Sequence, residues 1–141
     1  MRDPAQLHVM EAAEEVAALA YRATDRLPPG ERGGLYTQMR RAAISIGSNI
    51  SEGCGRSTDA QFSSFLQIAM GSACELEFQA RIAGRLSLAP TDDLMELHNA
   101  IITTKRMLAK LIVALRVRSR PPSPKGGAPR RRPESERSDA P

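Results

Sequence analysis

The stretch Arg40-Arg-Ala-Ala-Ile-Ser-Ile-Gly-Ser-Asn-Ile-Ser-Glu-Gly-Cys-Gly-Arg56 decides the fold of this chain. Its apolar residues recur at steps of three and four, the period of one face of an α-helix. Small and charged residues repeat at the same steps on a second face. Gly53 and Gly55 follow, and glycines at such a place commonly end a helix in a left-handed cap. The stretch therefore predicts a helix over 35–52 that packs one side into a core.

Three further stretches share this helical period. They are residues 5–27, a stretch from Thr58 to a break at 86–90, and a stretch from Thr91 to about Arg118. Short links make successive helices run antiparallel. The sequence therefore predicts an all-α fold, an antiparallel up-down-up-down four-helix bundle over residues 1–118.

Polar residues mark two of the predicted helix starts. Thr58 and Gln61 fit a capping box, in which each side chain satisfies a free backbone N–H of the other residue. Thr91 is predicted to cap the fourth helix. Asp92 and Asp93 then place negative charge at the positive end of that helix dipole.

Composition agrees with one helical domain. The chain has 141 residues, no tryptophan, three Phe and two Tyr, yet 41% of it is hydrophobic, so Ala, Leu and Ile must build the core. Cys54 and Cys74 form no metal-binding or disulfide pattern, which favours a reducing cytoplasm. No apolar run is long enough to span a membrane, and the N-terminus lacks a signal-peptide core. We expect a cytoplasmic protein without membrane contact.

The positive charge is concentrated in the last part of the chain. Residues 1–116 hold 13 Lys/Arg and 13 Asp/Glu, whereas residues 117–141 hold seven against three. Pro, Ser, Gly and Arg dominate from Pro121 on, so residues 119–141 are predicted to be a disordered basic tail. Such a tail either contacts a polyanion or only keeps the protein in solution.

The predicted third helix has a second apolar row, formed by Ile68, Gly71, Phe78 and Ile82, roughly opposite its inner face. A bundle helix that buries one side does not need a second apolar row. Isolated exposed apolar residues are nevertheless ordinary on protein surfaces. The regular spacing favours a buried contact with another copy of the chain, and Ile68, Phe78 and Ile82 are the predicted oligomer interface.

Catalytic patterns are weak. A di-metal carboxylate bundle needs two Glu-x-x-His units, but His8 and Glu11 stand in reverse order and Glu96 and His98 have the wrong spacing. No serine has a histidine placed by sequence to activate it. Cys54 next to Arg56 is at most a weakly activated thiol. We therefore predict a non-enzymatic protein with no catalytic residue, metal or cofactor.

Two segments together resemble a known family. Arg41-Ala-Ala-Ile-Ser-Ile-Gly-Ser-Asn-Ile-Ser-Glu-Gly53 and Phe65-Leu-Gln-Ile-Ala-Met-Gly-Ser-Ala-Cys-Glu-Leu-Glu77 are similar to the paired motifs of the bacterial four-helix bundle proteins. That family includes proteins encoded in intervening sequences of large-subunit ribosomal RNA genes. The similarity spans about residues 6–116. It implies a structural signature formed by Arg41, Asn49, Glu52, Gly53, Gly71, Ser72 and Glu75.

The resemblance also implies partners. The family is similar in architecture to the accessory variability determinant of diversity-generating retroelements, which is a barrel-like homopentamer that binds nucleic acid and a reverse transcriptase. It thus implies a homopentamer that contacts RNA or DNA and a reverse transcriptase. The alternative is an oligomeric scaffold that binds protein only. The candidate nucleic-acid-binding residues are Arg81, Arg85, Arg106, Lys110, Arg116, Arg118, Arg130, Arg131 and Arg132.

The antiparallel turn after Gly53 predicts contacts within the signature. Counting back from the turn brings Arg41 within reach of Glu75, so Arg40 or Arg41 should form an ion pair with Glu75. Asn49 and Glu52 are expected to hold the turn by hydrogen bonds.

Overall fold

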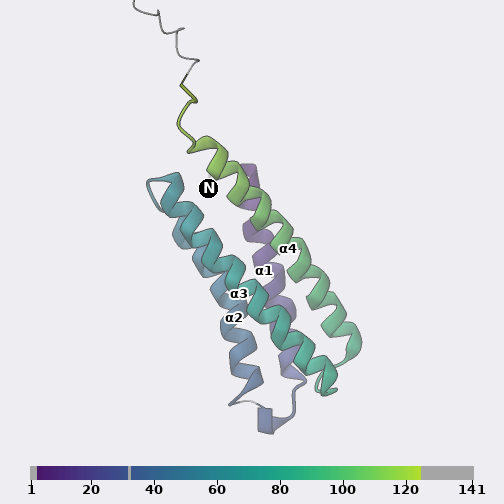
Figure 1. Ribbon diagram of the computed structural model, residues 1–141. Helices are drawn as coiled ribbons and strands as arrows, with labels where there is room; N and C mark the ends of the chain where they lie inside the picture. Colours follow the sequence, from purple (N-terminus) through teal and green to yellow (C-terminus); the bar gives the residue numbers. More distant parts are fainter. Residues whose placement is uncertain (1–2, 32, 125–141) are drawn as a thin grey trace, which may run out of the picture.

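The computed structural model describes residues 3–31 and 33–124, and these fold into four long helices and one short 3-10 turn. No strand occurs in this part of the chain. The all-α prediction is therefore confirmed (Figure 1). The elements are α1 (Pro4–Asp25), η1 (Pro29–Glu31), α2 (Leu35–Cys54), α3 (Asp59–Arg85) and α4 (Thr91–Arg118).

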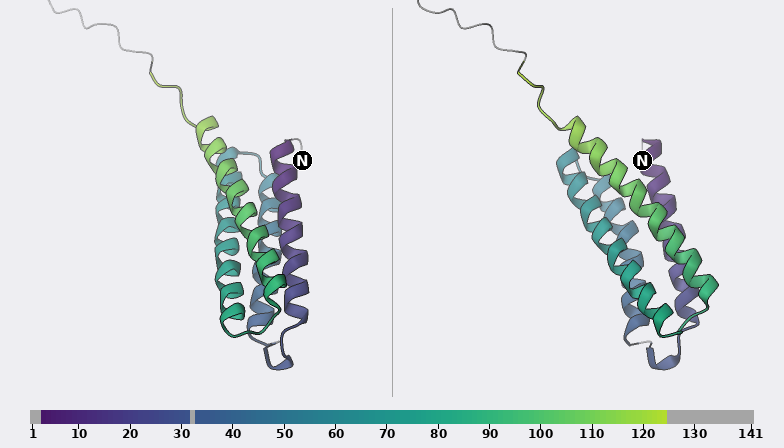
Figure 2. Two further views of the ribbon diagram at one scale, coloured as in Figure 1. Left: turned by 90° about the vertical axis from the view of Figure 1, so that its right-hand side faces the viewer. Right: turned by 45° about the vertical axis from the view of Figure 1, so that its right-hand side comes forward.

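The helices form an antiparallel bundle in which each one packs against two neighbours. The contacting pairs are α1 with α2, α2 with α3, α3 with α4, and α4 with α1. Two further views show the four helices running along one long axis (Figure 2). The start of α1, the α2–α3 turn and the end of α4 lie at one end, called here the upper end as it stands in Figure 1. The other two links lie at the lower end.

The core is built from the apolar stripes that the sequence predicts. Met39, Ile46 and Ile50 of α2 are at most 1% exposed, so the deciding stretch does face the interior. Burial of these aliphatic side chains supplies most of the driving force for helix packing. The other large, fully buried apolar side chains are Val9, Val16, Leu66, Leu76, Leu97, Ile101, Leu108 and Leu115.

Half of the predicted capping box at Thr58 is confirmed, since no described hydrogen bond joins the Thr58 backbone N–H to the Gln61 side chain, and the predicted Thr91 cap is wrong. Thr58 is the N-cap of α3, and its hydroxyl accepts a hydrogen bond from the backbone N–H of Gln61 at 3.2 Å. Pro90, not Thr91, occupies the N-cap position of α4 and gives no side-chain hydrogen bond. Asp92 and Asp93 lie in the first turn as expected, so their charge still opposes the positive end of the dipole.

The α2–α3 turn does not use the predicted left-handed glycine cap. Gly55 caps α2 with a φ of −83°, and no described glycine has a positive φ. The reason for glycine at 53 is space. A Cβ there would lie 2.8 Å from the Phe62 ring and 2.9 Å from the Cβ of Phe65. Gly53 is therefore needed because α2 and α3 approach each other closely at the turn.

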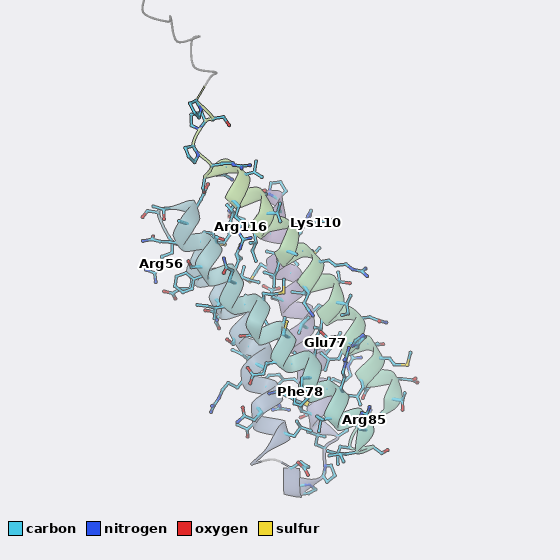
Figure 3. The ribbon with its side chains drawn as sticks, in the orientation of Figure 1. Arg56, Glu77, Phe78, Arg85, Lys110 and Arg116 are labelled. Atoms are coloured by element: carbon cyan, nitrogen blue, oxygen red, sulfur yellow. The ribbon has the colours of Figure 1, made fainter. Side chains whose placement is uncertain are left out.

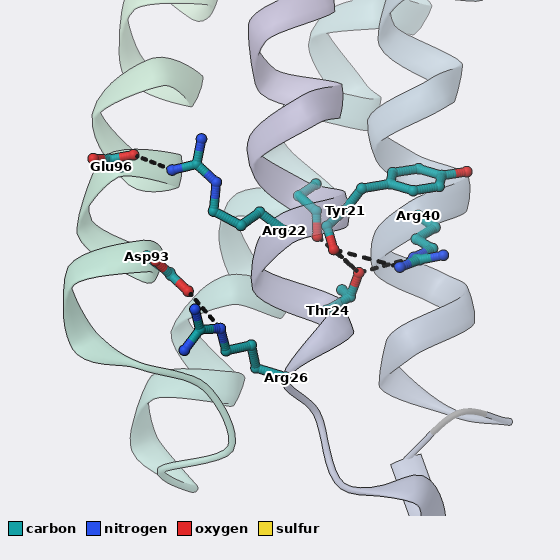
Figure 4. Close-up of polar contacts among 8 residues, drawn as sticks. Tyr21, Arg22, Thr24, Arg26, Arg40, Asp93 and Glu96 are labelled. Carbon is teal, nitrogen blue, oxygen red and sulfur yellow. Dashed lines mark hydrogen bonds and ion pairs between the residues drawn. The ribbon is translucent and has the colours of Figure 1, made fainter.

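Arg40 joins α2 to α1. Its Nε donates to the hydroxyl of Thr24 at 2.8 Å (Figure 4). Its Nη2 lies 2.6 Å from a carboxylate oxygen of Asp25. The guanidinium also lies 4.0 Å from the ring centres of both Tyr21 and Tyr36. Hydrogen bonds and cation–π contacts thus hold this arginine between the two helices.

The predicted ion pair of Arg40 or Arg41 with Glu75 is wrong for the described chain. Arg40 points to α1 instead, Arg41 is exposed, and Glu75 accepts a hydrogen bond from Gln79 of its own helix at 3.2 Å. A contact between two hydroxyls, Ser45 and Ser72 at 2.9 Å, bridges α2 and α3.

The two expected turn residues bond locally. Asn49 donates to the backbone oxygen of Ser45 at 2.8 Å, so it braces its own helix and does not reach the turn. Glu52 lies 2.6 Å from Arg56, which follows the helix end. Only Glu52 therefore contributes to the turn as predicted.

Glu77 forms the polar link between α3 and α4. One carboxylate oxygen lies 2.7 Å from the Lys105 ammonium, and the other lies 3.0 Å from Arg81. The hydrogen bond from Lys105 holds the pKa of Glu77 below its ordinary value, and the same bond raises the pKa of Lys105. Both groups therefore stay charged over the neutral range.

We predict that Gly53→Ala lowers the free energy of unfolding by about 1–3 kcal/mol, because the new Cβ must push apart two phenylalanines. Gly55→Ala is the matched control. Its Cβ would meet only the Glu52 backbone oxygen at 3.5 Å, so a change within about 0.5 kcal/mol is expected. Urea unfolding of both variants measures the difference, and equal stabilities would refute the close-approach explanation.

We predict that Glu77→Gln costs about 1 kcal/mol at pH 7, because it removes a charged hydrogen bond. The pKa of Glu77 is lower in the folded protein than in the unfolded chain, where a glutamate has a pKa of about 4.3. The resulting stabilisation is fully present above the unfolded pKa and is lost as the pH falls through the folded pKa. The gap between variant and wild type should therefore shrink below about pH 4. The control Glu96→Gln removes an exposed pair with Arg22 and should change little at any pH.

Candidate nucleic-acid interface

The C-terminal half of α4 presents a row of cations. Its apolar residues, including Leu108 and Leu115, turn into the core and leave the charged side chains outside. Figure 3 shows Lys110 and Arg116 on the upper half of this helix. The exposed cations of this segment and of the two residues that follow the helix are Arg106, Lys110, Arg116, Arg118 and Arg120, and we call them the α4 basic end.

Shallow grooves flank the α4 basic end on both sides. One groove, of about 500 Å³, lies against the start of α3 and is lined by Arg116, Arg120 and the buried Ser63. The other, of about 320 Å³, lies against the start of α1 and is lined by His8, Lys110 and Arg118. Cations therefore border both grooves and outnumber the one carboxylate in each, Asp59 and Asp3, an arrangement that suits an extended anion.

Most of these cations have no ion pair with another described residue. Arg118 forms an ion pair with Asp59 at 3.3 Å. Arg106, Lys110, Arg116 and Arg120 have no ion pair within residues 3–31 and 33–124. Their charge is therefore available to a partner.

The simpler explanation for these cations is that they stabilise the helix that carries them, without any binding partner. Arg116 and Arg118 lie in the last turn of α4, where cations interact favourably with the negative end of the dipole. This explanation does not extend to Arg106 and Lys110, which lie more than one turn from the helix end. A purely local role thus accounts for only part of the row.

Two of the predicted binding residues lie elsewhere. Arg81 and Arg85 are on the lower half of α3, and Arg85 is the last residue of that helix. Contacts of Lys105 with Glu77 and of Arg118 with Asp59 set the α3–α4 register. In this register Arg85 is about 20 residues of helix, or roughly 30 Å, below Arg116 (Figure 3). The predicted binding residues therefore lie at two separate places, with Arg81 and Arg85 apart from the α4 basic end.

The chain beyond α4 leaves from the same upper end. Residues 121–124 are exposed and have no regular structure. The predicted tail residues Arg130, Arg131 and Arg132 lie outside the described residues. Arg120 is a binding candidate absent from the predicted set, although its spacing of four from Arg116 was a usable signal.

The described residues assemble no recognisable catalytic centre. No group of three or more His, Cys, Asp or Glu is placed to hold a metal ion in the part of the chain that the structure describes. Partial burial raises the pKa of Cys54, which opposes the activation that its sequence neighbour Arg56 suggested. None of the described helices is both long and apolar enough to cross a bilayer.

The fold and this surface define a small antiparallel four-helix bundle protein with a basic end. Residues 5–110 match the family model described as 23S rRNA-intervening sequence protein. The chain therefore belongs to this family, and the resemblance in its paired motifs is confirmed.

A solved structure has the same fold. It is the 1.70 Å crystal structure of a protein with unknown function from the S23 ribosomal protein family of Bacteroides thetaiotaomicron VPI-5482. The two chains are 22% identical and superpose with a TM-score of 0.71 over 77% of this chain and 98% of that one. No curated protein matches the chain significantly.

Proposed function

We propose that this protein is a non-enzymatic, homo-oligomeric accessory protein that binds RNA or DNA through the α4 basic end. The observation that carries the proposal is the set of four exposed cations without an intramolecular ion pair among the described residues: Arg106, Lys110, Arg116 and Arg120. The basic segment that follows α4 starts at the same end and adds to its charge.

The proposed contact is electrostatic and only weakly selective for sequence. The chain has three Phe, two Tyr and no tryptophan, so it lacks a platform for base stacking. Lysine and arginine contacts to phosphates release counterions, which makes the affinity fall steeply with salt. Repetition of the basic end in an oligomer would raise the overall affinity further.

Self-association is supported by the exposed apolar residues of α3. Ile68 is 52% exposed and Phe78 is 64% exposed, while Ile82 is half-buried. Large apolar groups gain most from being covered. We propose a pentamer, and a reverse transcriptase as protein partner, on the family resemblance. The alternative of a protein-only scaffold is favoured by the equal numbers of acidic and basic residues in 1–116.

We predict that Lys110→Gln/Arg116→Gln weakens binding to labelled single-stranded RNA and DNA and flattens the log–log salt slope by about 1.4–1.8, the value for two phosphate contacts. The matched control is Arg81→Gln/Arg85→Gln, which removes the same charge at the lower end and should leave the slope unchanged. Fluorescence anisotropy across a salt series measures both. Equal effects of the two double variants would contradict binding at the upper end.

We also predict that removal of residues 119–141 flattens the salt slope, because this segment holds Arg120 and the Arg130–Arg132 run. The change should be about 0.7–0.9 for each phosphate that the segment neutralises. The truncation ends after α4, so the bundle should keep its helical circular dichroism spectrum. No binding by the full-length protein, even at about 50 mM salt, would reject nucleic-acid binding and leave the protein-only scaffold.

A further inference from the structure

The α1–α2 side of the bundle has a groove that is lined largely by small residues. The groove has a volume of about 820 Å³. Small side chains leave room for a neighbouring backbone to come close, which is how a helix ridge seats in a groove. The small residues that line it are Ala13, Ala17, Ala43, Gly47, Ser48, Ser51 and Gly55, and the charged residues Glu14, Glu52 and Arg56 line it as well.

The same face continues below the groove as an aromatic cluster. Tyr21 follows Ala17 by four residues, and Arg40 precedes Gly47 by seven, so both lie in line with the walls of the groove. Arg40 lies 4.0 Å from the ring centres of Tyr21 and Tyr36, and Tyr21 remains 39% exposed. We call the groove and this cluster together the α1–α2 face.

The outer side of α3 has the opposite shape. Ile68, Gly71, Glu75 and Phe78 follow one another at steps of three and four, so they share one helix face. The two large apolar residues are more than half exposed, and Glu75 is also exposed. We call this row the α3 ridge.

Each surface contains a helix-interior glycine that the folded chain does not require. A Cβ at Gly47 would only touch the Cβ of Ala13 at 3.8 Å, which is an ordinary contact. A Cβ at Gly71 would meet nothing within 4 Å. Glycine is less favourable than alanine inside a helix. Both glycines become understandable if another backbone approaches at these positions.

The two surfaces match in height along the bundle axis. The contact of Ser45 with Ser72 at 2.9 Å places Gly71 beside residue 46 of α2, next to Gly47. Phe78 lies seven residues, or roughly 10 Å, further down. Because α2 runs antiparallel to α3, Phe78 lies at the same height as residue 39 of α2, next to Arg40.

One pair of opposite charges is matched in height between the two surfaces, although Glu14 and Glu52 also line the groove. Glu75 lies on the α3 ridge between Gly71 and Phe78, and its only described partner is the amide of Gln79. Arg40 stands at a similar height on the α1–α2 face. Its side chain is 19% exposed and pairs with Asp25 through Nη2, while its Nη1 has no described partner. A second copy placed beside the first, with its axis parallel, brings Glu75 of one toward Arg40 of the other.

We infer that the α3 ridge of one copy docks on the α1–α2 face of a second copy. This inference rests on the self-association in the proposed function and specifies how the copies pair. Gly71 seats against Gly47, Phe78 covers the tyrosine cluster, and Glu75 meets Arg40. Because the two surfaces differ, the contact is heterologous and repeats from copy to copy until a ring closes.

A complementation experiment tests the pairing. Ile68→Asp/Phe78→Asp destroys the ridge and leaves the α1–α2 face intact. Ser48→Arg/Ser51→Arg fills the groove and leaves the ridge intact. All four positions are exposed, so each variant should keep the wild-type circular dichroism spectrum. Each variant alone should be a monomer by size-exclusion light scattering, and an equimolar mixture should form a 1:1 heterodimer that grows no further.

The outcomes separate this inference from the proposed function. If the wild type is an oligomer but the mixed variants form no heterodimer, the pairing is overturned and self-association uses other surfaces. A groove variant that still assembles like the wild type means that the groove is not used, which also overturns it. A wild type that is monomeric at micromolar concentration overturns the pairing and the oligomeric part of the proposed function, whereas RNA and DNA binding is measured separately.

The glycines offer a second measurement. Gly47→Ala and Gly71→Ala should each raise the unfolding temperature of the dissociated chain by about 2–5 °C, since alanine favours the helix. Each should at the same time weaken assembly by about tenfold or more, because the added methyl group separates the two backbones. Gly84→Ala, in α3 but away from both surfaces, is the control and should leave assembly unchanged. Unchanged assembly in both test variants would overturn the seating of Gly71 on Gly47.

Discussion

The close approach of α2 and α3 at Gly53 is the constraint on which the rest of the structure depends. The two phenylalanines of α3 fill the space that a side chain at 53 would take, so the close packing of the two helices at the turn requires glycine there. That geometry sets Ser45 against Ser72 and thereby the register of the two helices. The register then decides which residues of α3 face α4, where Glu77 meets Lys105, and which remain on the outer ridge. The packing at Gly53 thus helps to determine which residues lie on each of the two candidate surfaces.

The two proposed surfaces occupy different parts of the bundle and do not compete. The α4 basic end lies at the upper end, where the start of α1 and the α2–α3 turn also lie (Figure 1). The pairing surfaces run along the sides of α3 and of the α1–α2 pair. A ring built through these sides would carry one basic end per copy at the same rim. Several weak phosphate contacts would then act together, although the body of each chain carries no excess positive charge.

Arg40 shows where sequence reasoning reaches its limit. Counting back from the α2–α3 turn predicted a contact with Glu75 of α3, which lies within reach of an arginine side chain. The structure selects α1, because Thr24, Asp25 and two tyrosines together offer hydrogen bonds, charge and ring faces. Glu75 offers only a carboxylate, which stays on the outer face of α3. The division of the basic residues is a similar case: the sequence placed Arg85 and Arg116 in one candidate set, but only the antiparallel register shows that roughly 30 Å of helix separates these two residues.

The sequence by itself determined the four helices, their antiparallel order and the identity of the core residues. These follow from apolar spacing and short links, which are local properties that packing does not need to supply. It also showed the apolar row on α3 and the excess of basic residues near the C-terminus. Only the tertiary structure decided why Gly53 must be glycine, which partner each charged side chain takes, and which surfaces match in height. These depend on distances between residues far apart in the chain, and such distances exist only after the helices have packed.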